Sequence, residues 1–179
     1  MATMNNKKKI AVSAIGLGIV AYLIYKSMKK SIPSSGYVFP NGYADTQNWQ
    51  NADDGTDSPE NKKTKMMVGI ARAEGFGVPG SIPSRANNPG DLTRSLGYDT
   101  TGETLGSAGI VIFVDVPNGW AALEEQLTLI QNGGSIHKLT DTLLQFAQGY
   151  TTTDQEAWAN NVSQAIGLDP SATLSDALS

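Results

Sequence analysis

A single carboxylate, Glu74, stands between an apolar helical run and a turn rich in Gly, Pro and Asn. It follows Met67, Ile70 and Ala71 by seven, four and three residues, spacings that place all four side chains on one helix face. An apolar face removes water from a carboxylate, which disfavours the charged form and raises the pKa. We therefore expect a group that stays protonated near neutral pH, as the general acid of glycosidic cleavage must. The alternative is a solvated or backbone-bonded Glu at a helix end.

The helix that carries Glu74 is predicted over residues 59–76. Ser58 and Pro59 form a good N-cap and N1 pair, and the apolar residues that follow share one face. Residues 92–115 are rich in Gly, Thr and β-branched side chains, with residues 110–114 as the clearest strand. This region is predicted to form a small antiparallel β lobe.

Helices are predicted for most of the remaining chain. After the turn 117–119, Trp120, Leu123, Leu127 and Ile130 are spaced for the buried face of a helix that stops at Gly133 and Gly134. Further starts are expected at Thr140, at the capping box of Thr153 with Glu156, and after Asp169 and Pro170. The fold class is therefore α+β and mostly helical, with one domain over residues 59–179.

The N-terminal third has a different composition. Residues 1–9 form a basic tail, and residues 10–28 are predicted as a single transmembrane helix flanked by lysines. A cleaved signal peptide and a buried helix are the alternatives. Residues 29–58, mixed in Ser, Gly, Pro, Asn and Asp, are predicted as a linker. The acidic cluster at 53–57 lacks the spacing of a calcium loop and is interpreted as a solvated turn.

Composition and charge exclude several classes of function. The chain has no cysteine, so disulfides and Cys-based metal sites are impossible. Residues 31–179 hold seven Lys and Arg against seventeen Asp and Glu, a net charge of −10 that disfavours nucleic acid as a partner. The single histidine, His137, cannot build a Ser-His-Asp or His-metal site and is expected at the surface. No metal and no cofactor are predicted.

Three motifs resemble the pattern of phage virion-associated lysozymes and lytic transglycosylases of the lysozyme-like superfamily. They are the run 73-AEGF-76, the turn 87-NNPG-90 with Leu92, and Phe113 followed by Gly119, Ala122 and Leu123. The resemblance covers roughly residues 59–170. It implies a lysozyme-like catalytic domain that cleaves the β-1,4 bond between N-acetylmuramic acid and N-acetylglucosamine of peptidoglycan, with Glu74 as general acid.

The same resemblance implies that Asn87 and Asn88 shape the cleft floor and offer amide groups to N-acetyl sugars. A turn that uses Asn for backbone geometry is the alternative for this pair. Among the aromatic residues, Tyr98, Trp49 and Trp120 have faces on which sugars can stack. Trp120 lies on a helical apolar stripe and is predicted to be core.

Asp91 decides which reaction is expected. A hydrolase needs a second carboxylate, and Asp91 is the first candidate, with Asp99 next, although either can be a turn residue. A lytic transglycosylase manages with one Glu because the substrate's C6 hydroxyl is the nucleophile. Gly75 stands where many such enzymes carry Ser, their usual Gly-Leu-Met-Gln segment is absent, and Asp91 stands where similar sequences often have Asn. The reaction stays open, with transglycosylation slightly favoured.

The expected function is local opening of peptidoglycan during entry of a phage genome. It implies a location in a virion, associated with its membrane, or at the bacterial inner membrane with the domain on the periplasmic side. Glycan strands, the membrane through residues 10–28, and other virion proteins are the expected partners. The alternatives are a non-catalytic structural or peptidoglycan-binding protein of the same fold, and a bacterial envelope enzyme that remodels its own wall.

Overall fold

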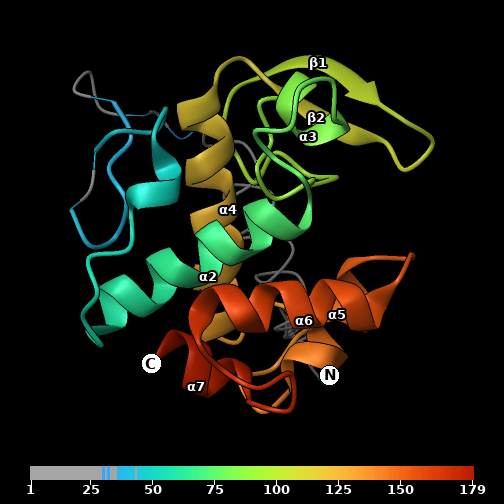
Figure 1. Ribbon diagram of the computed structural model, residues 1–179. Coiled ribbons are helices and arrows are strands. Elements are labelled where there is room, and N and C mark those ends of the chain that lie inside the picture. Colours follow the sequence, from blue (N-terminus) through green and yellow to red (C-terminus); the bar gives the residue numbers. More distant parts are fainter. Residues whose placement is uncertain (1–29, 31, 33–35, 43) are drawn as a thin grey trace, which may run out of the picture.

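The structure is a computed structural model that describes residues 30, 32, 36–42 and 44–179 (Figure 1). In this part of the chain, six α-helices, one short 3-10 helix and a two-stranded sheet form an α+β fold that is mostly helical. In chain order the elements are η1 (Trp49–Asn51), α2 (Pro59–Ala73), α3 (Ile82–Arg85), β1 (Thr100–Leu105), β2 (Ile110–Phe113), α4 (Val116–Gln131), α5 (Leu143–Tyr150), α6 (Gln155–Ile166) and α7 (Leu174–Leu178).

Helix α2 runs between the β region and the C-terminal helices (Figure 1). It begins as the sequence predicts, with Pro59 in its first turn and the Ser58 hydroxyl accepting the backbone N–H of Asn61. Its main neighbour is α6, and it also contacts α4 and α7. A Cβ on Gly69 would lie 3.3 Å from the Cβ of Ala165, so the small residue permits the close approach of α2 and α6.

Strands β1 and β2 pair antiparallel, with Thr100 opposite Phe113 and Leu105 opposite Ile110. The predicted β lobe is thus present, with β2 almost where residues 110–114 were expected. Only β2 is buried, and it packs into a small apolar cluster of Leu92, Val111, Phe113 and Ala122. This cluster ties the sheet to α4 and to the chain that follows the turn at 87–90.

Three predicted helix starts are shifted in the structure. Helix α4 starts at Val116 because Asp115 accepts the N–H of Asn118, so residues 117–119 lie in its first turn and not before it. Helix α5 is capped by Thr142 with Gln145, and not by Thr140. Helix α6 is capped by Asp154, which is one residue after Thr153. In each case another side chain reaches the free N–H groups of the first turn.

Part of the predicted linker is core. Tyr37, Phe39 and Trp49 are buried, and the rings of Phe39 and Trp49 lie 4.9 Å and 5.7 Å from the ring of Trp120. The Tyr37 hydroxyl donates to Glu124 on α4. The aromatic residues of this segment are scattered without a period, so the sequence does not indicate their burial. Removing each apolar ring from water nevertheless stabilises the fold. The linker prediction over 29–58 is therefore corrected for the described residues from 36 onward.

The acidic cluster at 53–57 belongs to the start of α2. Asp53 accepts the side-chain amide of the fully buried Asn61 at 2.8 Å and lies 3.7 Å from the Lys65 ammonium. Desolvation opposes ionisation of Asp53, but hydrogen bonds from Asn61 and Gly55 and the charge of Lys65 together lower its pKa. These contacts fix the chain before α2.

The predicted transmembrane helix is not supported. None of the helices that the structure describes is both long enough and apolar enough to cross a bilayer. Residues 10–28, on which the prediction rested, lie outside the described residues, as does the basic tail.

Candidate active site

Glu74 is the C-cap of α2, and its side chain is partly buried. Met67, Ile70 and Ala71, which were predicted to share its face, are all fully buried. One carboxylate oxygen, Oε1, accepts the indole N–H of Trp158 at 2.7 Å. The pKa of Glu74 is raised to about 7, because burial and the charge of Asp91 together outweigh the Trp158 hydrogen bond, which lowers it. The raised pKa expected from helical spacing is present.

Asp91 lies within electrostatic reach of Glu74, since its charge contributes to the raised pKa of that residue. Its backbone has φ of +49°, a left-handed conformation at the end of the turn. Burial raises the pKa of Asp91, and its buried Oδ1 has no hydrogen-bond partner among the described residues. A buried acceptor without a donor costs about 1–3 kcal/mol, so this oxygen is ready to accept from a ligand or a water.

Asn88 holds the turn before Asp91 in place. Its side chain is fully buried, its amide donates to the carbonyls of Leu92 and Val111 at 2.9 Å each, and its Oδ1 accepts the N–H of Leu92. With these bonds made inside the protein, Asn88 has no group left for a sugar. The predicted substrate role of Asn88 is corrected to the alternative, a residue that sets backbone geometry.

Asn87 has φ of +52° and donates its side-chain amide to the carbonyl of Phe113 at 3.1 Å. Its side chain is only partly buried, so its amide oxygen can still face solvent or a ligand. Asn87 and Asn88 therefore have different roles. Both shape the turn, but only Asn87 keeps exposed surface that a substrate can touch.

The turn at 87–90 and residues 119–123 of α4, which belong to two of the motifs noted in the sequence, meet in space. A Cβ on Gly119 would lie 1.9 Å from the carbonyl oxygen of Asn87, and one on Gly90 would lie 2.9 Å from a methyl of Leu123. The turn at 87–90 thus rests directly on the first two turns of α4. At position 119 only glycine allows this contact, because a backbone oxygen occupies the place of a Cβ, and at position 90 a Cβ would displace the Leu123 side chain. The turn at 87–90 and the motif at 119–123 therefore belong together because the turn packs against α4.

Tyr150, at the end of α5, is a site residue that the sequence analysis missed. Its hydroxyl donates to the carbonyl of Gly90 at 2.6 Å, and its ring centre lies 5.0 Å from that of Trp158. Burial, together with the charges of Glu74 and Asp91, raises its pKa well above the ordinary value, so the phenol stays neutral. Trp158 is buried on α6, and no local feature of the sequence indicates its hydrogen bond to Glu74.

The aromatic candidates do not gather at Glu74. Trp120 is fully buried, which confirms it as core, and Trp49 is also buried. Tyr98 is partly buried, packs against the apolar core, and has the Lys30 ammonium 5.5 Å from its ring centre. Tyr98 therefore retains some surface, but its contacts are structural.

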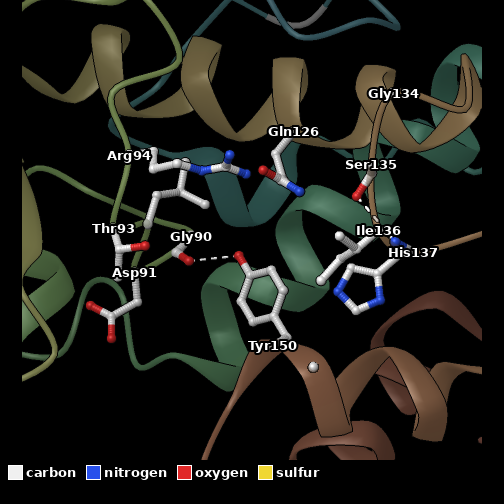
Figure 2. A pocket seen from close by; sticks show the side chains of 12 residues that line it. Gly90, Asp91, Thr93, Arg94, Gln126, Gly134, Ser135, Ile136, His137 and Tyr150 are labelled. Atoms are coloured by element: carbon white, nitrogen blue, oxygen red, sulfur yellow. Dashed lines mark hydrogen bonds between the residues drawn. The ribbon is translucent and has the colours of Figure 1, made fainter.

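A cavity of about 410 Å³ adjoins Asp91 and Tyr150 (Figure 2). Its walls come from the chain after the turn, from α4, from the loop after α4 and from the end of α5: Gly90, Asp91, Leu92, Thr93, Arg94, Gln126, Gly134, Ser135, Ile136, His137, Gly149 and Tyr150. Glu74 does not line this cavity. The cavity is therefore a neighbour of the carboxyl pair and shares Asp91 with it.

His137 is buried, and the prediction of a surface position is wrong. Its ring stands edge-on to Phe146 at 4.8 Å, and a Cβ on Gly149 would lie 2.4 Å from it. Burial lowers its pKa although nearby Asp141 opposes the shift, so the ring is neutral at pH 7. Gly149 has no side chain, and this leaves space for the His137 ring. The local sequence around His137 does not indicate this contact.

The arrangement suits proton transfer to a bound substrate. It joins a carboxyl group with a pKa near 7, which accepts the indole N–H of Trp158, to a second carboxyl within electrostatic reach. The described residues contain no cluster of three His, Asp or Glu side chains able to hold a metal ion. No protein family, curated protein or solved structure matches the chain.

Proposed function

We propose that this chain cleaves the β-1,4 glycosidic bond between N-acetylmuramic acid and N-acetylglucosamine in peptidoglycan, with Glu74 as proton donor. The observation that carries the proposal is the partly buried Glu74, whose pKa of about 7 lets it hold a proton at neutral pH and release it to a leaving oxygen. Asp91, within electrostatic reach of Glu74, adds the second carboxyl that such sites use. The motif resemblance supplies the substrate.

Transglycosylation is the proposed course of the reaction. Glu74 protonates the glycosidic oxygen as the C1–O bond breaks, and the C6 hydroxyl of the same muramyl residue then attacks C1 while Glu74 takes back a proton. The products are a 1,6-anhydro end and a free sugar hydroxyl, so no water is consumed. Asp91, when ionised, stabilises the positive charge that develops on the sugar ring.

The test compares the full chain with two variants on purified cell walls. Glu74→Gln keeps the shape but cannot donate a proton, so release of muropeptides should fall by at least about 100-fold, the lower range for general acid catalysis. Glu60→Gln, exposed in the first turn of the same helix, is the matched control and should retain activity. Mass spectrometry of the products should show 1,6-anhydro ends.

Two results would remove the enzymatic proposal. One is wild-type protein that binds walls but releases nothing, which would identify a binding protein, and the other is full activity in Glu74→Gln. Reducing ends in place of 1,6-anhydro ends would keep cleavage but replace transglycosylation with hydrolysis, in which Asp91 activates or positions water.

A further inference from the structure

The cavity beside Asp91 has the size and lining of a ligand site. Its volume of about 410 Å³ falls in the range of about 300–1,000 Å³ that small-molecule sites occupy. Four segments of the chain form its walls, and Asp91 is the one lining residue that also belongs to the carboxyl pair. Because Asp91 both lines the cavity and lies within electrostatic reach of Glu74, the cavity adjoins the proposed site of cleavage.

Among the described residues that line the cavity, Arg94 is the one permanent cation. Its side chain is exposed, and it has neither an ion pair nor a hydrogen bond in the part of the chain that the structure describes. His137 is neutral at pH 7 because burial lowers its pKa, so it adds no charge. The Asp91 carboxylate is directed away from the Arg94 guanidinium (Figure 2). An unpaired guanidinium in such a place favours a carboxylate or a phosphate as ligand.

Uncharged donors accompany Arg94. Gln126, on α4, points into the same space, and its amide has no hydrogen-bond partner among the described residues (Figure 2). Ser135 accepts the backbone N–H of His137 at 3.3 Å, which leaves its hydroxyl hydrogen free to donate. One guanidinium and two neutral donors match the two oxygens of a carboxylate better than a multiply charged phosphate.

We propose that this cavity binds a carboxylate of the glycan substrate through Arg94, an inference that rests on the proposed function. Peptidoglycan offers two sources of this group, the lactyl carboxyl of a muramyl residue without a peptide, and the free carboxyls of a stem peptide. Asp91 joins the cavity to Glu74, so capture of the carboxylate orients the muramyl residue toward the proton donor. Arg94 acts in binding and is remote from the bond that breaks.

Binding should be measured by calorimetry in the full chain carrying Glu74→Gln, so that no ligand is consumed. Three ligands are compared: chitobiose, which has no carboxylate, the N-acetylglucosamine–N-acetylmuramic acid disaccharide, and the same disaccharide with its stem peptide. Arg94→Gln should weaken binding of at least one carboxylate ligand by about tenfold and leave chitobiose unchanged. Arg85→Gln, exposed on α3 and outside the cavity, is the matched control and should change neither.

The ligand arms identify the source of the carboxylate. A loss with the peptide-free disaccharide assigns the lactyl group, and a loss confined to the peptide-bearing one assigns the peptide. The inference is overturned if Arg94→Gln weakens chitobiose as much as the carboxylate ligands, if it weakens none of them, or if the protein with Arg94 intact binds no carboxylate ligand. Because turnover is not measured, this result is independent of whether wild-type protein cleaves walls.

Discussion

Glu74 is subject to opposing influences that set its proton affinity. Burial and the charge of Asp91 disfavour ionisation, while the indole N–H of Trp158 stabilises the carboxylate. The balance leaves the pKa at about 7. The charge of Asp91 and the hydrogen bond from Trp158 come from different residues, so their effects on the pKa of Glu74 can be separated by substitution.

Stability should report the raised pKa without reference to activity. Below about pH 4 the carboxyl is protonated in both folded and unfolded chains, and as pH rises from 4.5 to about 7 the unfolded chain ionises first, so unfolding is favoured. Glu74→Gln, which cannot ionise, should raise the free energy of unfolding by about 1–3 kcal/mol at pH 8 and by little at pH 4. Urea unfolding at both pH values measures this.

The control for that measurement is Glu60→Gln on the same helix. Its exposed carboxylate lies in the first turn, where a negative charge interacts favourably with the helix dipole. Its loss should therefore destabilise the folded chain slightly at pH 8. A Glu74→Gln chain that is destabilised at pH 8 as well would mean that the carboxylate is favoured, and not penalised, in the fold.

Trp158→Phe should move the titration of Glu74 upward. The substitution keeps an aromatic ring but removes the donor to Oε1, and the loss of that bond leaves the charged form less stabilised. The Glu74 carboxyl resonance in ¹³C NMR should therefore titrate at higher pH, and the alkaline decline of cleavage should shift the same way. Trp120→Phe is the matched control, because the Trp120 N–H has no partner among the described residues. An equal shift in both variants would exclude the hydrogen bond as the cause.

At the scale of elements, the contact between α4 and the turn at 87–90 determines where Asp91 lies. Gly119→Ala would place a Cβ 1.9 Å from the carbonyl oxygen of Asn87, a backbone atom that cannot rotate away. We expect a loss of about 3 kcal/mol or more, together with loss of cleavage, because α4 must separate from the turn. Thermal unfolding and wall release both measure it.

Gly69→Ala is the graded comparison for Gly119→Ala. It also lies inside a helix, but its Cβ would meet the Ala165 Cβ at 3.3 Å, a contact that needs only a small shift. The better helix propensity of Ala, about 1 kcal/mol, should offset that shift and leave stability within about 1 kcal/mol of wild type. Equal losses at both sites would mean that the contact with Asn87 is unimportant.

The elements themselves were largely predictable, and the reasons for the exceptions are local. Periodicity and caps located α2 and the β region, since a helix start depends on a few adjacent residues. Neighbouring capping candidates such as Thr153 and Asp154 differ by one position, and the backbone conformation selects between them. The residue types near the start of a helix do not by themselves determine which of them is the N-cap.

At the scale of the whole molecule, the sequence predicted Glu74 and Asp91 as site residues and missed the contacts that Trp158 and Tyr150 make there. Glu74 was found because its helix face is encoded in spacings of three, four and seven residues. Trp158 lies 84 residues away from Glu74, and Tyr150 lies 60 residues away from Gly90, so only the packed fold brings them together. Asn88 and His137 were misjudged for the same reason, since burial is a property of the fold.

For the segment before α2, composition predicts a linker, whereas the packing shows buried core residues. A chain that begins at Ser58 lacks Phe39 and Trp49, which cover the fully buried Trp120. Truncating one buried Phe costs about 3–5 kcal/mol, and domains have about 5–15 kcal/mol in total, so this chain should lose its cooperative thermal transition in circular dichroism. A chain that begins at Lys30 is the control and should unfold as the full chain does. If both shortened chains unfold at the same temperature, residues 36–52 would be a tether after all.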